Sequence, residues 1–262
     1  MKPGFGRKTT GMKIGLVLSG GGARGLSHLG VAKALAERGI QPDIISGTSA
    51  GAIAGGLLAY GYTPDEILEI IIETNFIRSV RPSFGGTGLF RLDRLEEVYR
   101  KYIPENTFES LKTPLIVSAT DLYAGETVCF SQGELARPIL ASSCLPGLFE
   151  PIFFQKRYLV DGGVLNNMPV EPLEKEVDYI IGVHCNPFKL KTPPKNTREI
   201  VARSLILAMH AKTRERFDRC HLLIEPPELC DYSLYDLRKA RELFVLGYRY
   251  TRQILQEVPE FA

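Results

Sequence analysis

Ile44-Ile45-Ser46-Gly47-Thr48-Ser49-Ala50-Gly51-Ala52-Ile53-Ala54 is the stretch that decides the fold of this chain. It predicts a short buried strand, an abrupt turn and a helix rich in small residues. Residues 47–51 match G-x-S-x-G, the pattern that places a serine on a sharp corner between a strand and a helix. The two glycines remove the Cβ atoms that would collide as the strand and the helix close in. The pattern therefore predicts that Ser49 is a nucleophile whose hydroxyl projects above the edge of a sheet.

A second glycine-rich turn comes earlier in the chain. Residues 12–18 predict a buried strand, which runs into Ser19-Gly20-Gly21-Gly22-Ala23-Arg24-Gly25 and then into a helix that ends near residue 38. The match to G-x-G-x-x-G is weak by itself. A dinucleotide site would need an acidic residue at the end of the second strand, whereas Asp43 begins that strand. A phosphate-binding loop would need a Gly-Lys-Ser/Thr triplet, which this turn lacks.

Two interpretations of this turn remain. It is either a tight structural turn or an oxyanion hole, in which the N–H groups of Gly20, Gly21 and Gly22 point at one spot before a helix N-terminus. Two strand-turn-helix units in tandem, one with donors and one with a nucleophile, favour the oxyanion hole. Arg24 then steadies the loop or contacts an anionic head group, unless it is a plain surface residue.

The third informative stretch is Asp161-Gly162-Gly163, which ends a predicted strand that begins at residue 157. An aspartate at a strand end, followed by two glycines, can lie tightly against a neighbouring active-site loop. A plain Asp-Gly turn explains the same residues. These three residues alone do not decide between the two interpretations.

Strands and helices alternate along the whole chain, which predicts an α/β fold with a mainly parallel sheet and helices on both faces. Residues 12–262 are expected to form a single domain. Residues 1–11 are polar and basic, and we expect a flexible tail or a leftover of cloning. Further predicted strands are 114–120, 127–130, 177–183 and 221–224, and further predicted helices are 62–77, 135–143, 198–217 and 237–255.

Composition narrows the function classes. The 262 residues are 44% hydrophobic and 24% charged, as in an ordinary globular protein, and the net charge of +2 gives no reason to expect nucleic-acid binding. Five cysteines, an odd number, are scattered without a C-x-x-C pair, which favours a reduced, cytoplasmic setting. No apolar run approaches the roughly 18 residues that span a bilayer.

The three stretches together resemble the patatin-like phospholipases, in their order and spacing. The segments 141–149 and 166–169 resemble that family too. The resemblance implies a three-layer α/β/α fold and a Ser49–Asp161 catalytic dyad. It also implies an oxyanion hole from the 20–22 loop and hydrolysis of lipid acyl esters without a metal or cofactor. Gly163 departs from the pattern, because many members carry alanine there.

This mechanism sets a condition on the carboxylate. An aspartate with an ordinary pKa of about 4 is a weak base at neutral pH. Asp161 must therefore be partly desolvated, or paired with Ser49 without a neutralising arginine. It would accept the Ser49 proton during attack and later activate the hydrolytic water.

Other functions fit the sequence less well and stay open. The first is a Ser-His-Asp triad on an α/β-hydrolase fold, with one of His184, His210 or His221 as the base. The second is acyl transfer from a thioester carrier, although that chemistry usually places a histidine where Thr48 stands. The third is a non-catalytic module that binds lipid or acyl groups.

The expected partner is a lipid or a small acyl ester, and the sequence leaves the oligomeric state open. Residues 149–154 include three phenylalanines. They predict either a buried strand or an exposed apolar edge that makes transient contact with a membrane surface.

Overall fold

The computed structural model describes residues 11–74, 81–82, 86–188, 193–194 and 196–258, so residues 1–10 of the predicted tail lie outside it. Its main sheet contains β1 (Ile14–Leu18), β2 (Ile44–Gly47), β5 (Leu115–Asp121), β6 (Glu126–Phe130), β7 (Ile152–Phe154), β8 (Arg157–Asp161), β9 (Tyr179–Val183) and β10 (Leu222–Ile224). The strand order is β10-β9-β1-β2-β5-β8-β7, and β6 also pairs with β5. The first five strands of that order are mutually parallel, which confirms the predicted mainly parallel sheet. A separate pair joins β3 (Arg81–Pro82) and β4 (Phe90–Arg91).

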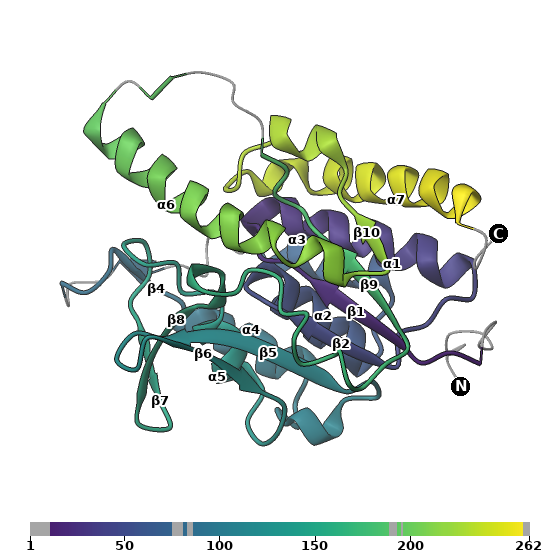
Figure 1. Cartoon of the computed structure of the whole chain (residues 1–262). Helices are drawn as coiled ribbons and strands as arrows, with labels where there is room; N and C mark the ends of the chain where they lie inside the picture. Colours follow the sequence, from purple (N-terminus) through teal and green to yellow (C-terminus); the bar gives the residue numbers. More distant parts are fainter. Residues whose placement is uncertain (1–10, 75–80, 83–85, 189–192, 195, 259–262) are drawn as a thin grey trace.

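Helices flank the sheet (Figure 1). The α-helices are α1 (Ser27–Glu37), α2 (Ala50–Tyr60), α3 (Pro64–Thr74), α4 (Asp93–Tyr102), α5 (Ala136–Ala141), α6 (Thr197–Arg214) and α7 (Ala240–Glu257). Short 3₁₀ helices are η1 (Gly22–Leu26), η3 (Phe108–Ser110), η4 (Gly162–Val164), η5 (Phe217–Arg219), η6 (Pro227–Asp231) and η7 (Leu237–Lys239). None of the helices among the described residues is both long enough and apolar enough to cross a membrane.

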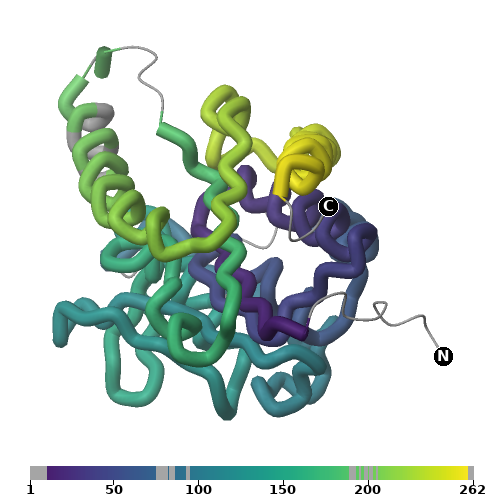
Figure 2. Tube along the Cα trace, turned by 45° about the vertical axis from the view of Figure 1, so that its right-hand side comes forward, coloured from purple at the N-terminus to yellow at the C-terminus, as the bar shows by residue number. Residues whose placement is uncertain are grey.

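Two apolar layers hold the sheet, one on each face. In β1, Leu16 and Leu18 face the large core shared with the helices α1, α2, α3, α5 and α7, whereas Val17 faces a smaller cluster. That smaller cluster is built from residues 168–180 and is covered in part by Phe217 of η5. Figures 1 and 2 place α6 on the opposite side of the sheet from α7. The predicted three-layer arrangement is therefore confirmed.

The helix boundaries follow local chemistry. Thr63 and Glu66 form the capping box that starts α3, since the Thr63 N–H donates to Glu66 Oε2 at 2.9 Å and the Glu66 N–H donates to Thr63 Oγ1 at 3.2 Å. Gly61 ends α2 with a φ of 109°, in the left-handed region that suits glycine. The predicted helix over 62–77 begins at Pro64 in the structure, and residues 75–77 lie outside the described part.

The hairpin between β7 and β8 determines where β8 ends. The two-residue turn Gln155–Lys156 joins β7 to β8, and both residues have positive φ, 48° and 63°, as in a type I′ turn. β5 continues four residues beyond Val117, the partner of Gly47 at the end of β2. Because β8 runs antiparallel to β5, it begins beyond the end of β2 and returns toward it, where Asp161 pairs with Ala119.

Candidate active site

Ser49 lies on the sharp corner between β2 and α2. Its φ of 53° and ψ of −121° are rare for a residue with a side chain, and such strain is often held at functional positions. A Cβ on Gly47 would lie 2.6 Å from the Gly51 carbonyl oxygen, and a Cβ on Gly51 would collide with the Leu18 carbonyl. Both glycines of the motif are therefore required by the close approach of strand and helix, as predicted.

A second serine holds this corner in place. The Ser49 N–H donates to Ser142 Oγ at 2.8 Å, and the Ser142 hydroxyl donates to the Ser118 carbonyl at 2.6 Å. The neighbouring Thr48 hydroxyl donates to the Asn166 carbonyl at 3.0 Å. These bonds tie the corner to the end of α5, to β5 and to the loop after η4. Ser142 belongs to the 141–149 segment, but no role was predicted for it.

Asp161 ends β8 beside this corner. The residue is 5% exposed, and its carboxylate accepts the Gly163 N–H at 2.8 Å on Oδ1. Burial raises the pKa of Asp161 to about 6, against the lowering effects of that N–H and of a side-chain hydrogen bond with Ser49. The structure thus brings the side chains of Ser49 and Asp161 together, in the partly desolvated setting that the sequence analysis required.

The glycine turn also lies beside Ser49. A Cβ on Gly20 would lie 3.1 Å from the Ser49 Cβ. The N–H of Gly20 donates to the Asn167 carbonyl at 3.1 Å, and the N–H of Ala23 donates to the Leu234 carbonyl at 2.8 Å. Within the described residues, the N–H groups of Gly21 and Gly22 have no hydrogen-bond acceptor. Two donors are therefore left open at this turn.

The carbonyl of Gly20 accepts hydrogen bonds from three side chains. Asn186 Nδ2 donates to it at 2.7 Å, Asn167 Nδ2 at 3.4 Å and the Cys185 thiol at 3.4 Å. Cys185 is fully buried, and burial raises the pKa of its thiol to about 11. Sequence reasoning missed Asn186 and Cys185, because they lie about 165 residues from the turn and carry no local motif.

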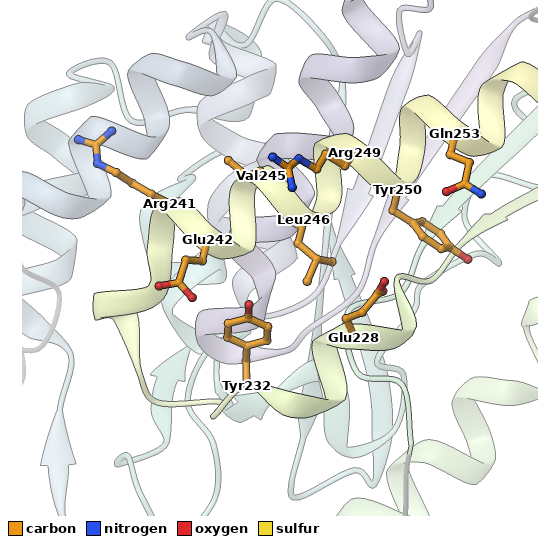
Figure 3. Close-up of a pocket in the computed structure, with 9 residues that line it drawn as sticks. All are labelled: Glu228, Tyr232, Arg241, Glu242, Val245, Leu246, Arg249, Tyr250 and Gln253. Carbon is orange, nitrogen blue, oxygen red and sulfur yellow. The ribbon is translucent and has the colours of Figure 1, made fainter.

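Arg24 faces away from the corner. Its guanidinium donates to the Tyr232 carbonyl at 2.7 and 2.9 Å and to the Cys230 carbonyl at 3.4 Å. Of the roles considered for Arg24, this geometry supports the steadying of the loop. The side chain of Tyr232, whose carbonyl accepts these bonds, lines a groove of about 550 Å³ between η6 and α7 (Figure 3). None of the predicted site residues lines that groove.

The four histidines have partners away from the corner. His28 Nε2 lies 2.8 Å from the Ser19 carbonyl, and His184 Nδ1 lies 2.6 Å from Glu225 Oε1. His221 Nδ1 accepts the Ile180 N–H at 3.0 Å, and the His210 ring packs against Phe188 and His184. All four lie in the described part of the chain, where no hydrogen bond joins any of them to Ser49 or Asp161.

The loop after Asp161 is crowded. A Cβ on Gly162 would collide with the Ser118 carbonyl. A Cβ on Gly163 would lie 2.8 Å from Asn167 Oδ1, 2.9 Å from Met209 Cε and 3.0 Å from Asp161 Oδ1. Met209 belongs to α6, so this helix reaches the loop that carries the carboxylate. An alanine at position 163 would therefore crowd the Asp161 carboxylate as well as Asn167 and Met209.

Residues 16–174, more than half of the chain, match the family model described as patatin-like phospholipase. The chain belongs to this family. The motifs that suggested it, the glycine turn, the Ser49 corner and Asp161-Gly162-Gly163, all fall within the matched residues.

Individual relatives of this patatin-like chain differ in how much of them it covers. It is 35% identical over 184 residues to an uncharacterised NTE family protein of Mycobacterium tuberculosis, an alignment covering 69% of this chain and 51% of the relative. It is 29% identical over 300 residues to the lysophospholipase NTE1 of Kluyveromyces lactis, which covers 97% of this chain and 20% of the relative. The chain therefore spans about half the length of the first relative and a fifth of the second.

A solved structure supports the fold. The crystal structure of VipD from Legionella pneumophila matches this chain with a TM-score of 0.57 at 19% sequence identity, covering 95% of this chain and 68% of VipD. This similarity concerns the arrangement of the backbone alone.

Proposed function

We propose that this patatin-like chain is a carboxylic ester hydrolase that cleaves lipid acyl esters through an acyl-Ser49 intermediate. The observation that carries the proposal is one juxtaposition. The Ser49 hydroxyl, on a strained corner, lies close enough to the buried Asp161 carboxylate to lower its pKa, and the open N–H groups of Gly21 and Gly22 lie on the neighbouring turn.

The proposed reaction has two halves, acylation and deacylation of Ser49, and each half uses the same groups. Ser49 Oγ attacks the ester carbonyl carbon and its proton passes to Asp161, while the N–H groups of Gly21 and Gly22 stabilise the oxyanion. The C–O bond to the alcohol breaks, and the alcohol leaves with the proton from Asp161. A water then attacks acyl-Ser49 with Asp161 as the base, which releases the fatty acid and restores the enzyme. Gly20 is not a donor in this scheme, since its N–H is already donated to Asn167.

A dyad accounts for the geometry better than a triad. A Ser-His-Asp triad needs an imidazole between the serine and the carboxylate, whereas here Ser49 itself acts on the pKa of Asp161. His184 and His221 instead bond to Glu225 and to the Ile180 backbone. Burial lowers the pKa of His28 to about 4, and its imidazole faces the Ser19 backbone. We therefore assign the proton transfer to Asp161.

The proposed substrates are lysophospholipids and short acyl esters. The family and the similarity to a lysophospholipase support a lipid ester in general. We further propose transient contact with a membrane surface from a cytoplasmic location. This membrane contact is supported by two exposed rings on the hairpin between β7 and β8, Phe153 and Tyr158, which are 53% and 55% exposed.

A substrate panel tests the proposal. The panel runs from short nitrophenyl esters to lysophospholipids and diacyl phospholipids, with wild type, Ser49→Ala and an exposed control, Ser233→Ala. We expect hydrolysis by wild type and the control, a loss of at least 1,000-fold in Ser49→Ala, and labelling of Ser49 by a fluorophosphonate. Absence of both hydrolysis and labelling would favour a binding module. Transfer to an added alcohol or lysolipid in place of hydrolysis would make the chain an acyltransferase.

A further inference from the structure

We infer that Asn186 is a positioning residue that aims the Gly21 N–H at the oxyanion. This inference rests on the proposed function, since it assigns a role within that same site. The starting point is the Gly20 carbonyl, which accepts Asn186 Nδ2 at 2.7 Å. That is the shortest of the three hydrogen bonds made to this oxygen.

Peptide geometry connects this bond to the oxyanion hole. The Gly20 C=O and the Gly21 N–H belong to one planar trans peptide, so they point in opposite directions. A donor that fixes the carbonyl on one side therefore fixes the N–H on the other side. Asn186 lies three residues after the end of β9 and thus holds the carbonyl at the β9 side of the turn. The opposite side is the one left for the developing negative charge.

Glycine makes this peptide free to rotate unless it is held. With glycine at both Gly20 and Gly21, the plane between them lacks the side-chain restraints of other residues. Asn186 also packs closely against Gly21. A Cβ on Gly21 would lie 3.0 Å from Asn186 Oδ1 and would collide with the Cys185 thiol. Asn186 thus contacts Gly21 while it anchors the carbonyl of Gly20.

The other two contacts cannot replace it. Asn167 and Cys185 reach the same oxygen only at 3.4 Å, and a thiol is a weak donor. Asn186 Oδ1 is buried and has no hydrogen-bond donor among the described residues. The amide therefore contributes one strong bond through Nδ2, and the backbone of Gly20 receives it.

The test compares Asn186→Ala, which removes the side chain, with Asn186→Asp, which keeps the shape but replaces the donor by an acceptor. The control is Asn196→Ala, an exposed asparagine at the start of α6. For each variant, kcat and KM are measured on a short nitrophenyl ester. The affinity for a trifluoromethyl ketone is measured in parallel, since this probe forms a tetrahedral alkoxide on a reactive serine.

Loss of one oxyanion donor typically lowers kcat by 10²–10³, and a misaimed donor should approach that range. We expect kcat to fall about 10-fold or more in the alanine variant and about 100-fold in the aspartate variant. KM should stay within threefold, and the affinity for the ketone should fall by the same factor as kcat. The control should match wild type. A pH profile of kcat/KM with its midpoint still near 6 would show that Asp161 is undisturbed.

Two results would overturn the inference: wild-type kcat in both variants, or a raised KM with unchanged affinity for the ketone. Should Asn186→Ala unfold, the shape-preserving aspartate variant decides, at a temperature below its melting midpoint. Failure of the inference and failure of the proposed function are distinguishable. If Ser49→Ala keeps wild-type hydrolysis, the proposed function is wrong whatever Asn186 does. If only the Asn186 variants behave like wild type, the inference alone is wrong.

Discussion

The charged form of Asp161 opposes folding. Its pKa is about 6 in the folded state and 3.8 as an ordinary aspartate, so the folded protein binds this proton more tightly than the unfolded chain does. The contribution of Asp161 to stability is therefore greatest below pH 4, falls as the pH rises from about 4 to 6, and stays lower above that window. Two pKa units correspond to about 3 kcal/mol, an upper bound for this loss.

Asp161→Asn should therefore inactivate the protein and stabilise it. We expect the free energy of unfolding to rise by about 1–3 kcal/mol at pH 8 and to change little at pH 4, because the neutral amide avoids the buried charge. Urea unfolding at both pH values measures this. Asp65→Asn, at an exposed carboxylate paired with Lys33, should change stability by less than about 0.5 kcal/mol at either pH. Equal effects of Asp161→Asn at pH 4 and pH 8 would contradict the argument.

In the reaction proposed above, the same carboxylate sets the pH dependence of activity. Asp161 acts as a base only when it is ionised, so kcat/KM should increase about tenfold per unit below pH 6 and level off above pH 7. Initial rates on a soluble ester from pH 4.5 to 8.5 give the profile. His221→Gln should leave the midpoint unchanged, since His221 bonds to the Ile180 backbone. A midpoint that moves with this histidine would point to a triad.

Single residues differ in how far the sequence could reveal them. Ser49 and its two glycines follow from a local motif, because a strand, a turn and a helix must meet within five residues. Asp161 needed the family resemblance, since an Asp-Gly pair is also a common turn. Ser142 and Asn186 act on backbone groups 93 and 166 residues away. No spacing in the sequence reports such contacts.

At the scale of elements, the sequence predicted the type of most strands and helices but not their ends. The predicted helix over 237–255 appears as η7 followed by α7, in which Ala240, Leu243 and Phe244 are buried. The short pair β3 and β4 lies in a part of the chain for which no strand was predicted. Strands of two residues are held by tertiary contact and leave no periodic pattern.

The turn between β7 and β8 carries two non-glycine residues in the left-handed region. Asn-Gly is the preferred pair for such a turn. Gln155→Asn together with Lys156→Gly should therefore raise the stability by about 1 kcal/mol, with unchanged kcat, as measured by thermal unfolding and ester hydrolysis. The matched control, Gln132→Asn, changes the same residue type at an exposed site outside this turn. A lower melting midpoint in the turn variant would show that the present side chains stabilise the hairpin.

At the scale of the whole molecule, two hairpins project beyond the edge of the sheet that carries Ser49. β5 extends four residues past the end of β2, about 13 Å at the usual rise per residue. Leu122, Phe153 and Tyr158 are exposed there, and the rings of the last two lie 5.0 Å apart. Two alternatives were predicted for residues 149–154, a buried strand or an exposed apolar edge. The structure shows features of both, since residues 152–154 form the edge strand β7, with Phe153 exposed and Phe154 packed on Phe130.

Removing these two rings should separate membrane substrates from soluble ones. We expect Phe153→Ser with Tyr158→Ser to lower hydrolysis of phospholipid vesicles about tenfold, which corresponds to about 1.4 kcal/mol of lost surface binding. Rates on a soluble nitrophenyl ester should stay within twofold. Val245→Ser, at an exposed site on α7, is the control. An equal loss on both substrates would place the effect inside the site rather than at a lipid surface.

Asn166 and Asn167 follow the loop that carries the carboxylate, and they bond to both of the other loops. Thr48 donates to the Asn166 carbonyl, and Gly20 exchanges hydrogen bonds with Asn167. The three loops should therefore open to solvent as one cooperative unit. In hydrogen–deuterium exchange, the amides of Gly20, Ser49 and Gly163 should share one opening free energy and one urea dependence, although about 140 residues separate the first from the last.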